Sequence, residues 1–81
     1  MSVHVADDVI RLEGACPVED AETLLIALQE GPDRSVDVAA LASAHLAVIQ
    51  VLLATRPKLV GSSGNAFLES FVLPGLRKGT G

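Results

Sequence analysis

The amino-acid sequence predicts a single α/β domain with a mixed four-stranded sheet and three helices, in the order β-β-α-β-α-β-α. Three observations support this prediction. The chain has only 81 residues, enough for one domain. Apolar residues make up 49% of it and charged residues 20%, a balance that excludes a disordered chain. Short strand-like runs alternate with helical patterns, which is typical of βαβ crossovers and a sheet with parallel pairs.

Residues 3–5 and 9–13 are the first two predicted strands. In the second, Ile10 and Leu12 alternate with charged residues, as expected for a strand with one buried face. Two aspartates between the runs favour a turn. We therefore expect these strands to form an antiparallel pair, with Gly14 ending the second.

The first predicted helix spans residues 17–30. Pro17 suits the first helical position, where its missing N–H group is not needed. Glu19 and Asp20 complement the positive end of the helix dipole. Gly31 and a following proline end the helix. Apolar residues recur at three- and four-residue spacing and form one stripe, which contains Val18, Ala21, Leu24, Leu25 and Leu28.

The next three elements are a strand at 35–38, a helix at 44–55 and a strand at 58–60. The helix is apolar on nearly every side, a pattern that predicts burial on most sides. We therefore expect both Leu52 and Leu53 to lie in the core.

A third helix follows a loop at 61–64. Asn65 is placed to cap this helix, and Pro74 with the glycine after it is expected to end it. The apolar residues expected to share one face of the helix are Phe67, Leu68, Phe71 and Val72. The predicted domain covers residues 1–76, and residues 77–81 are expected to be a frayed tail.

Charge and hydropathy narrow the classes of function. The net charge is −4, the basic residues are scattered, and two phenylalanines are the only aromatic residues. Nucleic-acid binding needs clustered basic side chains or stacking aromatics, so that class is excluded. The single Cys16 fits a reducing cytosol, and no signal peptide is visible. The longest apolar stretch, 38–54, is too short to span a bilayer. We therefore expect a cytoplasmic protein without direct membrane insertion.

The residues with catalytic or metal-binding chemistry are few. Cys16 lies at a helix N-terminus and is either a reactive thiol or a small apolar filler. His4 and His45 together with Cys16 match no zinc spacing, and the loop at 61–64 lacks the lysine and glycine spacing of a P-loop. We therefore expect no catalytic residue, no cofactor and no metal. His45 is either a half-exposed residue with one satisfied nitrogen or part of a binding surface.

Three segments resemble the STAS domain, the fold shared by bacterial anti-sigma factor antagonists and the tails of sulfate transporters. They are VIRLEG, VEDAETLLIAL and VDVAALASAHLAVIQVLLA, the last with Asp37 in its strand and a leucine-rich helix. The resemblance covers residues 3–72. It implies the STAS fold and a non-enzymatic, protein-binding role in bacterial signalling.

The sequence departs from the family where regulatory members carry Asp, two hydroxyl residues and Gly. Those places fall on His45, Leu46, Ala47 and Val48. Ala47 has no hydroxyl, so we expect no phosphorylation at the family position. Ser43 lies upstream and is expected to cap the helix. Because the centres of protein interfaces are depleted in charge, these five residues are the predicted partner-binding site.

The resemblance leaves several partners open. An anti-sigma factor, a kinase-like switch protein and a chemotaxis-cluster protein are all consistent with it. Similar small domains also serve as accessory subunits of phospholipid-transport ABC machines, so a transporter subunit is a second alternative. A small ligand-binding or catalytic protein is a third, and it would require a concave pocket with convergent polar groups.

Overall fold

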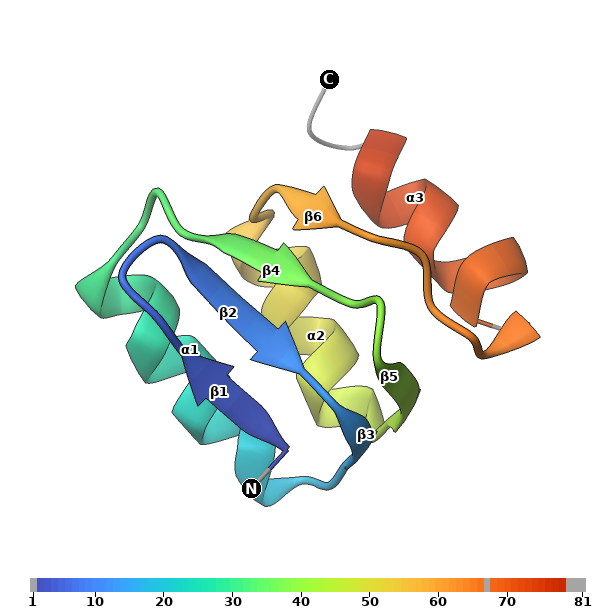
Figure 1. Ribbon diagram of the computed structural model, residues 1–81, viewed down its shortest axis with the longest axis horizontal. Helices are drawn as coiled ribbons and strands as arrows, with labels where there is room; N and C mark the ends of the chain where they lie inside the picture. The colour runs from blue at the N-terminus through green and yellow to red at the C-terminus, as the bar shows by residue number, and fades with distance from the viewer. Residues whose placement is uncertain (1, 67, 79–81) are drawn as a thin grey trace.

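The computed structural model describes residues 2–66 and 68–78, and it is an α/β fold with a mixed four-stranded sheet and three α-helices within that part of the chain (Figure 1). The elements are β1 (Val3–Val5), β2 (Val9–Leu12), β3 (Gly14–Cys16), α1 (Glu19–Glu30), β4 (Ser35–Asp37), β5 (Leu41–Ala44), α2 (Leu46–Thr55), β6 (Leu59–Val60), the π-helical turn η1 (Leu68–Val72) and α3 (Leu73–Lys78). The four-stranded sheet has the order β1-β2-β4-β6, and β3 pairs with β5 in a second sheet.

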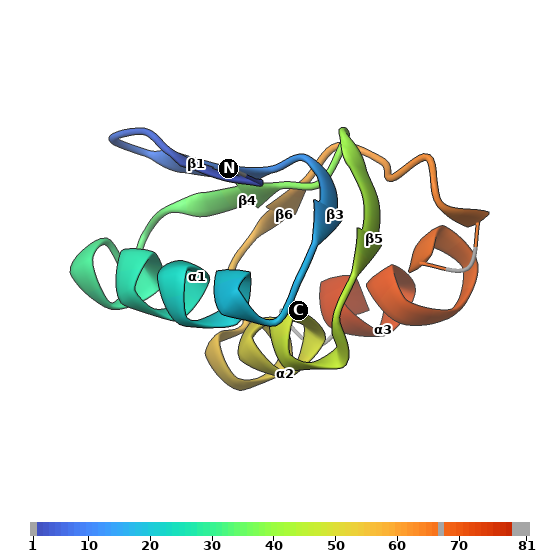
Figure 2. The ribbon, with the colours of Figure 1, turned by 90° about the horizontal axis from the view of Figure 1, so that it is seen from below.

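The sheet confirms the predicted antiparallel pair, because β1 runs antiparallel to β2. Strand β2 pairs in parallel with β4, and β4 with β6, so both crossovers carry a helix. Figure 2 shows α1, α2 and α3 together on one side of this sheet. Alternation along the strands directs Ile10 and Val36 into the core. On the opposite face of the sheet, Arg11 of β2 and Asp37 of β4 are register partners and lie side by side.

The pair β3–β5 is not predicted by the sequence. Strand β2 ends just before Gly14, as expected. Gly14 has a φ of +65° and turns the chain, but the residues that follow it form another strand pair instead of leaving the sheet region. Its N–H donates to the carbonyl of Ala40 at 2.8 Å, and the two chain segments continue in parallel as β3 and β5. Ala42 is an extra residue in β5, since Gly14 faces Leu41 and Ala15 faces Ser43. Both predicted helix starts are therefore early: α1 begins at Glu19 and α2 at Leu46.

The third helix begins as predicted but ends later. The Oδ1 atom of Asn65 accepts the N–H of Leu68 at 3.1 Å, which confirms the cap. Pro74 does not end the helix, because it lies in the first turn of α3, where an N–H is not needed. Residues 77 and 78, expected in the tail, belong to α3. Residues 67 and 79–81 lie outside the described residues, as do the side chains of Phe71 and Val72.

The core lies between the sheet and the helices. Helix α2 contributes only Val48 and Leu52 as fully buried residues. The prediction for Leu52 is confirmed, and that for Leu53 is wrong, since Leu53 is 45% exposed. Figure 2 shows why: α2 lies below the sheet, with one side toward the strands and the opposite side open. The buried hydrophobic residues are Val3, Ile10, Leu12, Cys16, Ala21, Leu24, Ala27, Leu28, Val36, Val38, Leu41, Val48, Leu52, Leu68 and Leu73.

Candidate functional site

The candidate site lies where β3 and β5 end and two helices begin. Cys16, the last residue of β3, faces Ala44, the last residue of β5. The His45 N–H donates to the Cys16 carbonyl at 2.8 Å, which ties the two chain segments together. Because β3 leads into α1 and β5 into α2, the N-terminal ends of both helices are brought to the same edge of the molecule (Figure 2).

His45 is the N-cap of α2. Its Nδ1 atom accepts the N–H of Ala47 at 3.0 Å, so this nitrogen carries no proton in the capped state. The His45 side chain is exposed and has one satisfied nitrogen, as the first of the two alternatives for His45 expected; its place on a binding surface stays a prediction. The capping role expected of Ser43 is wrong, because Ser43 lies in β5, two residues before the cap.

The five predicted contact residues differ in exposure. Ser43, His45 and Leu46 are exposed, and Leu46 is 65% exposed. Ala47 is half-buried, and it offers no hydroxyl to a kinase. Val48 is 0% exposed and packs in the core, so its prediction as a contact residue is wrong. One turn of an α-helix carries residues on both its inner and outer sides, and Val48 is on the inner side.

A shallow groove of about 340 Å³ runs between α1 and α2 and extends the exposed start of α2. Exposed apolar side chains are also found on the same two helices or at their starts, namely Val18, Ile26, Leu46 and Leu53. Sequence reasoning missed the contribution of α1. The adjacent apolar residues Leu25 and Ile26 could have revealed it, because two neighbouring apolar positions extend the apolar surface of the helix beyond the single stripe that the core covers. The residues that line the groove are Ala21, Glu22, Leu25, Ala47, Gln50, Val51 and Ala54.

Cys16 is the buried filler that one of the two alternatives expected. It is 2% exposed, and the pKa of its thiol is raised from 9.0 to about 11. Burial is the main cause, followed by the negative charge of Asp20 and a hydrogen bond to it. At neutral pH the thiol is therefore protonated and a poor nucleophile. Asp20 is itself buried, and its Oδ2 atom has no hydrogen-bond partner in the described part of the chain.

The shifted thiol predicts a loss of stability in alkaline solution. A pKa higher in the folded chain than in the unfolded one means that the folded chain keeps a proton that the unfolded chain releases. The free energy of unfolding should therefore fall between pH 9 and pH 11, by up to about 2–3 kcal/mol. Denaturant titrations across this range test the prediction, with Cys16→Ala as the control that should lose this part of the pH dependence. An identical slope in both proteins would contradict the prediction.

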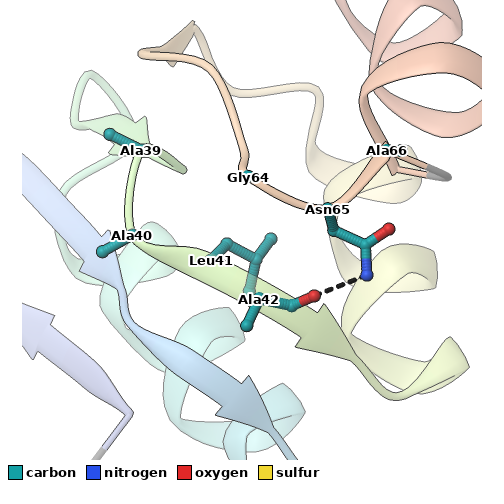
Figure 3. Close-up of a pocket in the computed structure, with 7 residues that line it drawn as sticks. All are labelled: Ala39, Ala40, Leu41, Ala42, Gly64, Asn65 and Ala66. Atoms are coloured by element: carbon teal, nitrogen blue, oxygen red, sulfur yellow. Dashed lines mark hydrogen bonds between the residues drawn. The ribbon is translucent and has the colours of Figure 1, made fainter.

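A second pocket, of about 580 Å³, lies along β5 and the loop before η1 (Figure 3). Alanine, leucine and glycine line it together with Asn65. Both ends of the Asn65 side chain are engaged, because its Nδ2 donates to the Ala42 carbonyl and its Oδ1 caps the helix. This pocket therefore presents no free polar side chain among its lining residues, and it is a poor match to a substrate site.

The loop at 61–64 is held by hydrogen bonds to η1 and β5. The Ser63 N–H donates to Oε1 of Glu69 at 2.7 Å, so a carboxylate of the same chain already accepts the donor that a phosphate would need. The Ser63 hydroxyl donates to the Leu41 carbonyl at 2.6 Å. These contacts favour a structural loop that fastens the C-terminal helix to β5.

Residues 2–66 and 68–78 contain no group of three or more His, Cys, Asp or Glu side chains arranged to hold a metal ion. No helix in the described part of the chain has the length and apolar character needed to cross a membrane. No family model matches the sequence, and no curated protein or solved structure matches it. The function is therefore inferred from the exposed surfaces of the protein.

Proposed function

We propose that the chain is a STAS-like, non-enzymatic module that binds a partner protein in bacterial signalling through the start of α2. The observation that carries this proposal is the exposed apolar side chain of Leu46, beside the exposed His45 and Ser43. Large apolar side chains gathered on a surface mark sites of protein interaction more often than isolated ones do. The neighbouring exposure of Leu53 extends the apolar surface by two turns along α2.

The architecture is compatible with this proposal. The mixed sheet, with its antiparallel first pair and two helical crossovers, is compatible with the STAS resemblance, although β3 and β5 are additional to the predicted order of elements. The proposed partner is an anti-sigma factor, a kinase-like switch protein or a chemotaxis-cluster protein. Ala47 has no hydroxyl, so we propose that phosphorylation at that position does not control binding.

Leu46→Asp tests the proposed function. The variant should weaken binding at least tenfold, because docking would bury an unpaired carboxylate. Folding should be unaffected, since Leu46 is the first residue of α2 and an acid there is favoured by about 0.3–1 kcal/mol. The partner would be captured from a lysate with the parent protein, identified by mass spectrometry, purified and titrated against the variants, with melting temperatures measured on the same samples.

Ala6→Asp is the matched control, because Ala6 is exposed in the turn between β1 and β2 and receives the same added charge. It should bind like the parent protein. If Leu46→Asp binds as tightly as Ala6→Asp, the proposed site is wrong. If Leu46→Asp unfolds the domain, Leu46 is a core residue and the assignment fails for a different reason.

A further inference from the structure

We infer that the groove between α1 and α2 receives an amphipathic helix of the partner, with lysine or arginine along the flank that faces α1. The inference rests on the proposed function and specifies the chemistry of the partner. It follows from the shape of the groove, the size of the side chains on its floor and the distribution of charge on its two sides.

The shape of the groove matches a helix. Its lining residues on α1, Ala21, Glu22 and Leu25, are spaced three and four apart and form one stripe. The stripe on α2 has the same spacing over two turns, from Ala47 through Gln50 and Val51 to Ala54. Two neighbouring helices that present such stripes form a channel that an apolar helix face can fill, a recurrent mode of peptide recognition.

The side chains on the floor of the groove are small. Three of its seven lining residues are alanines, namely Ala21, Ala47 and Ala54. Small residues let a third helix approach closely and leave room for its larger apolar side chains. The partner therefore supplies leucine-like residues at three- and four-residue spacing.

Charge distinguishes the two sides of the groove. Helix α1 contains Glu19, Asp20, Glu22 and Glu30 and no basic residue, and the three glutamates are exposed. Helix α2 contains no charged residue at all. Glu22 lies in the groove lining, and Glu19 and Glu30 lie on the adjoining outer side of α1 at helical spacing. A partner helix complements this arrangement if its side next to α1 is basic and its side next to Leu46 and Leu53 is apolar.

The same charges argue against two other occupants. A second copy of the chain carries the same net charge of −4 and no basic residue on α1 or α2 to place against Glu22. An anionic membrane surface would be repelled by the α1 glutamates, because such surfaces attract polybasic segments. A basic amphipathic helix satisfies both the apolar floor and the acidic side.

Two synthetic peptides test the inference. Both are helical, carry the same leucine stripe and a fluorescent label, and differ only in one flank, which contains three lysines in one peptide and three glutamates in the other. Fluorescence anisotropy at low and physiological salt measures their affinities for the protein. We expect the lysine peptide to bind roughly tenfold more tightly, since three exposed ion pairs contribute about twofold each. The preference should diminish with salt.

Two variants and one control variant locate the binding. Glu22→Lys should reduce or reverse the preference for the lysine peptide, while Asp8→Lys, the same charge change in the exposed β1–β2 turn, should lower it only slightly. Ala54→Glu should block both peptides by filling the groove. Circular dichroism of each variant shows whether it remains folded, and Glu22 is exposed, so its replacement leaves the core intact.

Equal affinity for the two peptides, no binding of either, or a preference that Glu22→Lys leaves unchanged would overturn the inference. Self-association of the parent protein that Ala54→Glu abolishes would assign the groove to a second copy and would also overturn it. If the purified partner loses affinity with Leu46→Asp but not with Glu22→Lys or Ala54→Glu, the proposed function stands and the groove inference fails. If the peptides behave as expected and Leu46→Asp has no effect on the partner, the proposed site at the start of α2 fails instead.

Discussion

Leu52→Ala should lower the free energy of unfolding by about 2–5 kcal/mol, whereas Leu53→Ala should lower it by no more than about 0.5 kcal/mol. The two residues are neighbours on α2, but Leu52 is 0% exposed and Leu53 is 45% exposed. Loss of the Leu52 side chain would leave a cavity between α2 and the sheet. Loss of the Leu53 side chain removes contacts only at the surface. For a small domain, whose total stability is typically about 5–15 kcal/mol, the first loss is severe.

Urea titrations of both variants and the parent protein measure this difference. Each alanine variant is the control for the other, because the chemical change and the helix propensity are identical. Similar midpoints for the two variants would contradict the orientation of α2. A larger loss of stability for Leu53→Ala than for Leu52→Ala would mean that the Leu53 side of α2, and not the Leu52 side, packs against the sheet.

Gly61→Ala should destabilise the protein by about 2–5 kcal/mol, and Gly14→Ala by about 1–2 kcal/mol. Both glycines have positive φ, +81° and +65°, so any other residue is strained at either position. At Gly61 a Cβ atom would also lie 2.9 Å from the Cβ of Ala39 and 2.9 Å from Oδ1 of Asp37. That carboxylate accepts the N–H of Ala39, so the clash falls on the turn that ends β4. Overpacking of this kind adds about 1–3 kcal/mol.

Gly14→Ala isolates the backbone strain, because a Cβ atom added at Gly14 would meet no other atom within 4 Å. Thermal and urea unfolding of the two variants give the comparison directly. Equal destabilisation would mean that the close approach of β6 to the end of β4 relaxes at little cost. It would contradict the tight contact between Gly61 and Ala39.

The sequence predicts the four-stranded sheet and the first two helices well, because each depends on a local pattern. The alternation in residues 9–13 and the apolar stripe of residues 18–28 determine which faces are buried. Ile10, Leu12, Ala21, Leu24 and Leu28 are buried as predicted, whereas Leu25 is half-buried and the prediction for Val18 is wrong, since Val18 is exposed just before α1 begins. The Asn65 cap is similarly local. Such features require only the spacing of side chains along one element.

The pair β3–β5 could not be predicted in the same way. Gly14 resembles the end of a strand, and the alanines and serine of residues 41–44 favour no strand by propensity. Their strand conformation comes from pairing across the fold with residues 14–16. The error in the helix start follows from this, because the residues before His45 are used in that pair.

The sequence does not predict how the start of α2 is capped or which of its side chains are exposed. Serine is a common N-cap and histidine a rare one, so the pattern favours Ser43 as the cap although His45 takes that role. An all-apolar helix also carries no mark of which side is covered. The predictions for Leu53 and Val48 are wrong for this reason, since only the packing of α2 against the sheet and α1 distinguishes them.

Nuclear magnetic resonance mapping of the captured partner onto the isotope-labelled protein tests the proposed surface most directly. The amide signals of Ser43, His45, Leu46 and Ala47 should shift on titration, together with those of the groove stripes on α1 and α2. The signals of His4, Arg11 and Asp37, whose residues pair across the open side of the sheet, should remain in place. Shifts confined to those sheet residues, with none at the start of α2, would contradict the account.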